Sequence, residues 1–394
     1  MDLSAIQKAL SEASVDGWLF CDFHHRDLMA YKILGLDSNS LTTRRWFYFI
    51  PTEGQPVKLS HKVEPHKLDS LPGEQQPYLA YTELHEKLAA AVQGKKTIAM
   101  QYSPMNNIPY VSVVDAGTIE LVRSFGVEIV SSADLVQQFD AVTGEDGYRS
   151  HCETGAKVHA IKDEAFKGMD DALRKGQQIT EYDVREFILS RFEQEGLTAD
   201  GSVPIVGFND HPADPHFEPT KEIAHTLHHG DTILLDLWAR RQDPPGVYYD
   251  ITWCGFAGQQ PPPMYGEIWE IVTTARDAGL DFVRRRFDEG RPCHGWEVDD
   301  VVRAVVKEAG FGEHFLHRTG HSIGVNDVHG NGANLDNLET KDERLLVPGT
   351  CFSIEPGIYL EGRMAVRTEI DVYLTPQGKV EVYGPIQKDL LLIG

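Results

Sequence analysis

Four acidic residues interrupt apolar, strand-like segments in the second half of the chain. Asp236 and Asp250 lie in two such segments, separated by the turn-forming run Arg-Gln-Asp-Pro-Pro-Gly at 241–246. A hairpin whose turn is centred on Asp243 would place these aspartates opposite each other, and opposite residues in paired strands have Cβ atoms about 5 Å apart. The spacing therefore predicts one pair of neighbouring carboxylates.

A second hairpin is predicted further along the chain by the same reasoning. Glu355 and Glu369 are equidistant from Gly362, which lies in a turn-forming run between two apolar segments. Side chains alternate between the two faces of a strand, so Arg367, Glu369 and Asp371 should share one face. We therefore expect Glu355 and Glu369 to form a second carboxylate pair.

Carboxylates that are buried close together repel one another unless they are protonated or neutralised by cations. Two divalent ions would supply four positive charges to these four groups. Carboxylates that bridge ions about 3.5–4 Å apart are the usual arrangement in two-metal hydrolysis. A single acidic residue on a strand more often faces solvent, but two symmetric pairs next to a histidine motif favour a metal site.

That motif is His-Arg-Thr-Gly-His-Ser-Ile-Gly at 317–324, and it supplies His321 as a fifth potential ligand. The glycines permit tight turns and close approach to a ligand. An isolated histidine would more often be a hydrogen-bonded structural residue. One imidazole beside four carboxylates, however, suits manganese, cobalt or zinc.

The composition narrows the possible partners. Acidic residues outnumber basic ones by 60 to 37, which gives a formal charge of -23. Such a surface repels phosphate groups, so nucleic acid and anionic membranes are not expected as partners. The sequence has neither the features of a secretion signal nor an apolar run of about 20 residues. The five cysteines are scattered, which indicates reduced thiols and a cytoplasmic location, with a catalytic cysteine as a less favoured alternative.

The elements that must position the acidic pairs fall into two groups. The first 145 residues alternate between helical and strand-like patterns, which indicates an α/β layer with a mixed or parallel sheet. The polar, glycine-containing run 142–147 is predicted as the boundary. Residues 146–394 mix helices with strands joined by glycine- and proline-containing turns, an α+β pattern. Helices are predicted over 5–13, 82–92, 117–124, 151–175, 180–195, 265–289 and 297–308, and strands of the first part over 17–20, 46–50, 97–100 and 127–130.

Taken together, these residues resemble the pita-bread metallopeptidases, the family of proline dipeptidase, Xaa-Pro aminopeptidase, methionine aminopeptidase and creatinase. The family's ligand set of two aspartates, one histidine and two glutamates matches in chain order as Asp236, Asp250, His321, Glu355 and Glu369. The local sequences match as well: Asp-Ile-Thr at 250–252, His-Arg-Thr-Gly-His at 317–321, Ile-Glu-Pro-Gly-Ile-Tyr at 354–359 and Val-Arg-Thr-Glu-Ile-Asp at 366–371. The resemblance covers most of residues 150–394, which implies a C-terminal pita-bread domain of antiparallel sheets with flanking helices. Residues 1–145 resemble the smaller N-terminal domain of creatinase and prolidase.

The resemblance also implies roles for residues beside the ligands. His216 and His329 match the family's proton-handling positions and would stabilise an oxyanion or relay protons, while Arg367 matches the arginine before the last glutamate. Lys341 and Arg344, in the loop before Glu355, are candidates to hold the free carboxylate of a dipeptide, with a solvated surface role as the alternative. Three further histidines have no family counterpart and are predicted to be surface residues: His225, His228 and His229.

Two departures from the family pattern concern the rim of the site. The spacing between Asp236 and Asp250 is three residues longer than usual, which enlarges the hairpin loop. One extra residue separates His321 from His329, and Gly330 follows where an acid is more usual. These changes bear on which peptides the site would accept.

The resemblance implies two divalent metal ions, manganese first, with cobalt or zinc as alternatives, and hydrolysis of the bond before proline. Glu355 would accept a proton from the attacking water and pass it to the leaving nitrogen. The predicted substrate is an Xaa-Pro dipeptide; the alternatives are a longer peptide cleaved by an Xaa-Pro aminopeptidase and a non-enzymatic binding or scaffold role. Relatives are commonly dimers, so a homodimer is expected.

Overall fold

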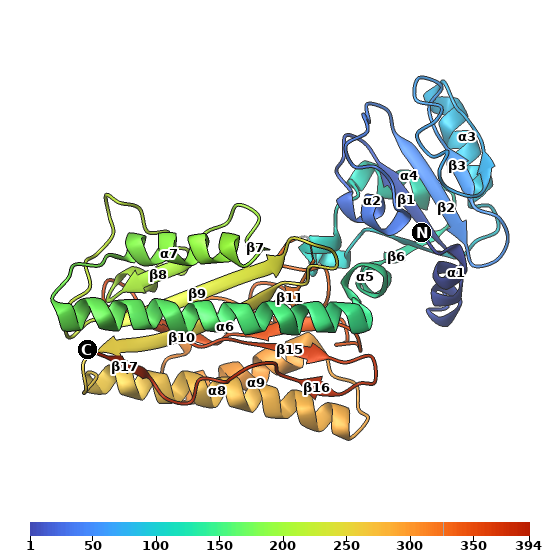
Figure 1. The fold of residues 1–394 in the computed structure, drawn as a ribbon. Coiled ribbons are helices and arrows are strands. Elements are labelled where there is room, and N and C mark those ends of the chain that lie inside the picture. Colours follow the sequence, from blue (N-terminus) through green and yellow to red (C-terminus); the bar gives the residue numbers. More distant parts are fainter. Residues whose placement is uncertain (326) are drawn as a thin grey trace. The chain divides into compact units, whose positions relative to one another are not determined.

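The computed structural model describes residues 1–325 and 327–394, and these form two compact units, Met1–Asp140 and Ala141–Gly394 (Figure 1). In the described part of the chain, no helix combines the length and the apolarity that a membrane crossing requires. Each unit has its own hydrophobic cores.

The first unit contains a six-stranded sheet in the order β4-β3-β2-β1-β5-β6. The pair β1–β2 is antiparallel and the pairs β1–β5 and β5–β6 are parallel, so the sheet is mixed, as predicted. Helices α1, α2 and α5 contribute to one core and α3 and α4 to another, so both faces are covered. The strands are β1 Gly17–Asp22, β2 Trp46–Pro51, β3 Val57–Leu59, β4 Glu74–Gln75, β5 Thr97–Met100 and β6 Glu128–Ser131. The helices are α1 Leu3–Glu12, α2 Leu28–Leu34, α3 Tyr81–Ala91, α4 Ala116–Arg123 and α5 Ala133–Val136, with short turns at Pro104–Asn106, Pro109–Val111 and Gln137–Ala141.

The second unit is built from two sheets and a separate hairpin, with helices on the outside. One sheet has the order β17-β10-β9-β7, and β8 also pairs with β9; the other has the order β11-β12-β15-β16. The strands are β7 Leu197–Thr198, β8 Ile205–Phe208, β9 Thr232–Arg241, β10 Tyr249–Ala257, β11 Ser322–Ile323, β12 Cys351–Ile354, β13 Gly357–Leu360, β14 Met364–Arg367, β15 Ile370–Leu374, β16 Val380–Glu381 and β17 Leu391–Ile393. The helices are α6 Gly144–Lys175, α7 Glu181–Gln194, η4 His211–Ala213, α8 Pro263–Asp288, α9 Gly295–Glu308 and η5 Gly312–His314.

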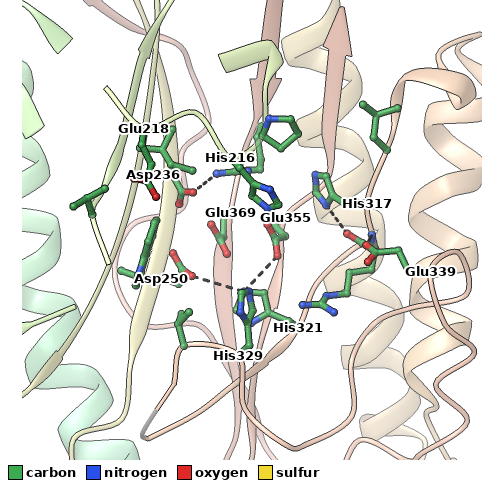
Figure 2. A pocket seen from close by; sticks show the side chains of 18 residues that line it. His216, Glu218, Asp236, Asp250, His317, His321, His329, Glu339, Glu355 and Glu369 are labelled. Carbon is green, nitrogen blue, oxygen red and sulfur yellow. Dashed lines mark hydrogen bonds and ion pairs between the residues drawn. The ribbon is translucent and has the colours of Figure 1, made fainter. Parts of the chain in front are cut away.

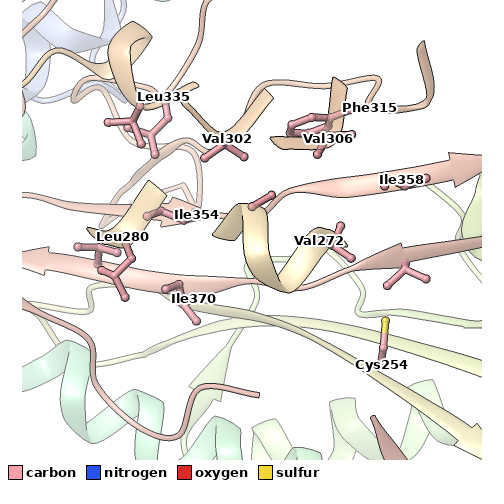
Figure 3. Close-up of a cluster of buried hydrophobic side chains, with 14 of the residues drawn as sticks. Cys254, Val272, Leu280, Val302, Val306, Phe315, Leu335, Ile354, Ile358 and Ile370 are labelled. Atoms are coloured by element: carbon pink, nitrogen blue, oxygen red, sulfur yellow. The ribbon is translucent and has the colours of Figure 1, made fainter. Parts of the chain in front are cut away.

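Two hydrophobic cores hold these sheets in place. Helices α6 and α7 pack on β9 and β10 through apolar residues such as Ile161, Ile188 and Leu237. Helices α8 and α9 pack on β12 and β15 through residues such as Val302 and Ile354 (Figure 3). Each hairpin that carries an acidic pair is therefore backed by helices on one side.

The register of the first hairpin differs from the prediction. Asp236 lies opposite Thr252, and Asp250 lies opposite Trp238, so the two aspartates are diagonal neighbours. The ladder of β9 and β10 is centred on Pro244, one residue beyond the predicted centre at Asp243. Because the shift is two residues, both aspartates still point to the same face.

The second hairpin is confirmed in its predicted register. Gly357 pairs with Arg367, and Cys351 pairs with Tyr373, so both ladders are centred on Gly362. Glu355 and Glu369 lie between the two ladders at equivalent positions.

The predicted boundary run is partly helical. Helix α6 begins at Gly144, and Glu145 and Asp146 lie in its first turn. Acidic side chains there interact favourably with the positive end of the helix dipole, which explains why this polar run is helical instead of a loop.

Asp27 makes the stability of the first unit depend on pH. This residue caps α2 through Oδ1, but its Oδ2 is buried and has no hydrogen-bond partner among the described residues. Burial, together with the nearby charge of Asp22, raises the pKa of Asp27 to about 7. The unfolded chain loses this proton near its ordinary pKa, so stability should fall as pH rises from about 4 to about 7.

We expect Asp27→Asn to reduce this loss, because the amide can still cap the helix and carries no charge. A shift of about three pKa units corresponds to about 4 kcal/mol at most. Thermal unfolding at pH 5 and pH 8 should show a smaller pH difference in Asp27→Asn than in the wild type. Glu53→Gln, at an exposed position of the same unit, is the control; equal pH dependence in all three proteins would contradict the prediction.

Candidate metal centre

A cavity of about 540 Å³ in the second unit brings the predicted ligands together (Figure 2). All five line it: Asp236, Asp250, His321, Glu355 and Glu369. His216, His329 and Arg367 line it too, so eight of the predicted site residues share one space.

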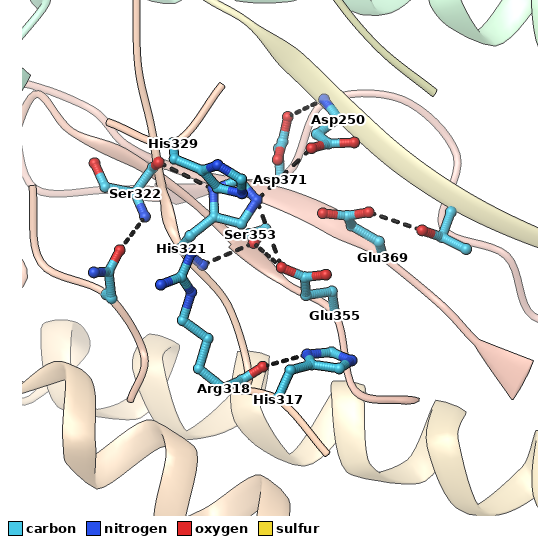
Figure 4. Close-up of polar contacts among 12 residues, drawn as sticks. Asp250, His317, Arg318, His321, Ser322, His329, Ser353, Glu355, Glu369 and Asp371 are labelled. Carbon is cyan, nitrogen blue, oxygen red and sulfur yellow. Dashed lines mark hydrogen bonds and ion pairs between the residues drawn. The ribbon is translucent and has the colours of Figure 1, made fainter. Parts of the chain in front are cut away.

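Backbone hydrogen bonds between the hairpins and the histidine motif fix this arrangement. The Glu369 amide donates to the Thr252 carbonyl at 3.3 Å, which connects the second hairpin to β10. The Glu355 amide donates to the Thr319 carbonyl at 2.7 Å. The His321 amide donates to Ser353 Oγ at 3.0 Å, so the motif lies directly against β12 (Figure 4).

The side chains leave potential ligand atoms close together. His321 Nε2 lies 3.7 Å from Asp250 Oδ2 and 3.5 Å from Glu355 Oε1. His321 Nδ1 donates to the Ser322 carbonyl at 3.1 Å, which leaves Nε2 with a lone pair for a cation. Thr252 bonds to Asp236 Oδ1 at 3.1 Å and to Glu369 Oε2 at 2.9 Å, so one hydroxyl holds a carboxylate from each pair.

The negative charges of the buried carboxylates are only partly neutralised by other protein groups. Burial raises the pKa of Asp250 and of Glu369 well above their ordinary values, and each is raised further by the charge of the other acids. Burial also raises the pKa of Glu355 to about 7. Asp250 Oδ1 and Glu369 Oε1 are buried without a hydrogen-bond partner among the described residues. Oxygen atoms with one imidazole are donors that divalent cations accept, so the residues present fit such ions.

Arg367 compensates part of the negative charge. Its guanidinium donates to Asp236 Oδ2, to Thr252 Oγ1 at 3.0 Å and to Tyr359 Oη at 3.3 Å. A buried arginine with these partners holds Asp236 in place, and one positive charge does not balance four acids. Asp371 adds a further buried acid, and its Oδ2 accepts from the Asp250 amide at 2.7 Å.

The two predicted proton-handling histidines lie at the same cavity. His216 is exposed and follows the short helix η4. The ring of His329 is centred 4.3 Å from that of His321. Among the histidines predicted to be surface residues, His228 and His229 are exposed. His225 stacks on His211, but its side chain is still 43% exposed, so it also lies at the surface.

Lys341 and Arg344 are not among the described residues that line the cavity. Arg344 is buried, where it donates to both oxygens of Asp342 at 2.9 and 2.6 Å and to the Asn331 carbonyl at 2.7 Å. Lys341 is half exposed and pairs with Glu343 at 2.8 Å. The structure thus gives Arg344 a structural role and leaves Lys341 at the surface.

Three charged residues of the cavity lining were not predicted: Arg318, Glu218 and Glu339. The Arg318 amide donates to Glu339 Oε1 at 2.8 Å, so these two residues hold adjacent loops together. Arg318 lies inside the 317–321 motif, and its position between two histidines was the available signal. Nothing in the local sequence marks Glu218 or Glu339.

A helix-flanked α+β unit that gathers two aspartates, one histidine and two glutamates in a cavity defines a metallopeptidase of the pita-bread fold. The profile of metallopeptidase family M24 matches residues 155–376, more than half of the chain. The chain belongs to this family.

Individual relatives agree with this assignment. The chain is 31% identical over 264 residues to the probable dipeptidase PepE of Mycobacterium tuberculosis; the match covers 67% of this chain and 64% of that protein, which is less than two thirds of its length. It is 30% identical to the Xaa-Pro dipeptidase of Lactobacillus helveticus over 59% of this chain and 58% of that protein. The crystal structure of dipeptidase PepE from Mycobacterium ulcerans matches 99% of this chain and 96% of its own with a TM-score of 0.70 at 24% identity, which shows the shared fold.

We expect Asp250→Asn to abolish metal-dependent stabilisation. The substitution removes one buried charge, so the metal-free variant should be at least as stable as the metal-free wild type. A divalent ion at a hundred times its Kd should stabilise the wild type by about 3 kcal/mol and the variant by much less.

Thermal unfolding with and without manganese, together with metal content per chain, measures this. Asp243→Asn, in the exposed connection between β9 and β10, is the matched control and should bind metal like the wild type. Equal metal content in Asp250→Asn and wild type would show that Asp250 is not a ligand.

Proposed function

We propose that this chain is a metal-dependent dipeptidase that hydrolyses the peptide bond before proline. Residues 146–394 would form the catalytic domain and 1–145 the N-terminal domain. The observation that carries the proposal is the convergence of five potential ligands, two of them with unpartnered buried oxygens among the described residues, at one cavity. The choice of Xaa-Pro substrates is supported by the similarity to the Xaa-Pro dipeptidase of Lactobacillus helveticus.

Asp236, Asp250, His321, Glu355 and Glu369 would hold two divalent ions, manganese first, with cobalt or zinc as alternatives. Such ions, when bound, lower the pKa of water and polarise a carbonyl group. The free state of the five cysteines supports a cytoplasmic enzyme. A homodimer is proposed from the family resemblance.

The chain's own residues would move protons and orient the substrate. Glu355 accepts from Ser353 Oγ at 3.1 Å, which holds its carboxylate toward the cavity, and it would carry a proton from the attacking water to the leaving proline nitrogen. His216 and His329 would donate to the oxygen that becomes negative during attack. Arg367 would keep Asp236 oriented.

Arg318 is proposed to bind the free carboxylate of the dipeptide. Among the described lysines and arginines, only Arg318 and Arg367 line the cavity, and Arg318 lies in the motif that also supplies His321. Burial lowers the pKa of His329, and the nearby charge of Arg318 also lowers it. A guanidinium in this place favours a substrate that ends one residue after the scissile bond.

The assay that tests this function uses metal-stripped protein. It compares an Xaa-Pro dipeptide with an Xaa-Pro-containing tripeptide, each with and without manganese. We expect manganese-dependent cleavage of the dipeptide and little cleavage of the tripeptide. Preferred cleavage of the tripeptide would identify an Xaa-Pro aminopeptidase instead. With metal confirmed as bound, no cleavage of either peptide would refute the proposed substrate class.

We expect Arg318→Met to raise KM for an Xaa-Pro dipeptide about 10- to 100-fold, because a hydrogen bond to a charged group contributes about 1.5–3 kcal/mol. The same dipeptide with an amidated C-terminus should be cleaved equally by variant and wild type. Lys341→Met is the control, since Lys341 lies outside the cavity lining. An equal loss with the acid and the amide would show that Arg318 does not recognise the carboxylate.

A further inference from the structure

Glu181, at the start of α7, is a fully buried carboxylate outside the candidate metal centre. Its own helix does not need it as a cap, because Thr180 and Asp183 form a complete capping box. Burying this carboxylate is costly, and burial raises the pKa of Glu181. Its position therefore requires partners elsewhere.

Those partners belong to one chain segment, residues 208–225. Oε1 accepts from the Phe208 amide at 2.6 Å, and Oε2 accepts from the His225 amide at 2.6 Å. His211 Nδ1 donates between the two oxygens, at 2.9 and 2.8 Å. The Glu181 amide in turn donates to the His225 carbonyl at 3.1 Å. A single carboxylate thus joins the beginning and the end of the segment.

The segment carries His216 to the cavity. The ring of His211 stacks on Phe217 at 4.1 Å between centroids and on His225 at 3.6 Å. Phe217 is buried and is the immediate neighbour of His216. The helical turn η4 also approaches β8 closely, since a Cβ on Gly207 would lie 2.6 Å from Pro212 Cγ. The contacts run from Glu181 through His211 and Phe217 to the residue that lines the cavity.

We propose that Glu181 is a positioning residue that fixes His216 in the active site by clasping the two ends of the 208–225 segment. The inference rests on the proposed function, in which His216 acts on the substrate. It adds a residue that the ligand motifs do not contain and that lies on helix α7, whereas the candidate ligands lie on strands and the segments beside them.

A cation site at the same place is the competing explanation, because Glu181, His211 and His225 have potential ligand atoms within 4.8 Å of one another. The hydrogen bonds favour the positioning role, in which the Glu181 carboxylate joins the two ends of the 208–225 segment; we call this arrangement the clasp. Both carboxylate oxygens already accept from N–H groups, and the Nδ1 atom of His211 points at them as a donor. The two imidazoles lie nearly parallel, at 19°, so they stack on each other instead of converging on one point.

The test compares Glu181→Gln with Glu193→Gln, an exposed position on the same helix. The glutamine amide keeps the size of the side chain but turns one acceptor into a donor that faces an N–H group. We expect kcat for an Xaa-Pro dipeptide to fall at least tenfold in Glu181→Gln, with little change in KM and unchanged metal content. Glu193→Gln should match the wild type.

A double-mutant cycle with His216→Ala separates positioning from general destabilisation. If Glu181 acts through His216, the double variant should be no slower than His216→Ala alone. Independent, multiplying losses would overturn the proposal. So would a bound metal ion that is present in the wild type and missing from Glu181→Gln.

Hydrogen exchange of the 208–225 segment tests the clasp without any substrate. Exchange there should be faster in Glu181→Gln than in the wild type and unchanged in α8 and α9. If the wild type cleaves no Xaa-Pro peptide, the proposed function fails while this measurement still reports on the clasp. Unchanged exchange in the segment would overturn the clasp whatever the activity.

Discussion

The carboxylates of Asp250 and Glu369 are enclosed by apolar strands, and each has an oxygen without a hydrogen-bond partner among the described residues. Such groups destabilise an apolar interior unless positive charge is supplied. Arg367 supplies one charge, directed at Asp236. The remaining negative charge suits divalent ions, so ion binding would contribute to the stability of this unit as well as to its chemistry. The two helix-backed hairpins keep the acids together despite their repulsion.

Other buried acids in the same unit have a different role, and their hydrogen bonds distinguish them. Asp299 accepts from the Thr319 and Asn337 amides at 3.0 and 2.9 Å. Asp336 accepts from three successive amides at 338–340. Glu181 is of the same kind. These carboxylates accept hydrogen bonds from backbone N–H groups of neighbouring segments and so hold those segments in place, whereas Asp250 and Glu369 face the cavity.

The features predicted from sequence are those that depend on local pattern. The second hairpin is symmetric about Gly362, so its register could be read from spacing alone. The first hairpin could not, because its ladder is centred on Pro244, and the turn-forming run at 241–246 does not distinguish this centre from Asp243. Helix α6 was predicted from residue 151 but begins at Gly144, since its first turn is polar and lacks the apolar periodicity that marks the rest. The five candidate ligands could be selected from the sequence because they lie in motifs on or beside these local elements.

The loops around the cavity could not be predicted from the sequence. Arg344, and not Arg318, was predicted from the sequence as a carboxylate-binding residue. Arg344 forms a buried ion pair with Asp342. Arg318 lines the cavity and belongs to the motif that also supplies His321. The two arginines differ in location, since Arg344 is buried beside Asp342 and Arg318 lines the cavity, and these locations depend on loop conformation. Under the proposed function, the loops around the cavity would therefore set substrate preference, while the hairpins would hold the metal ions.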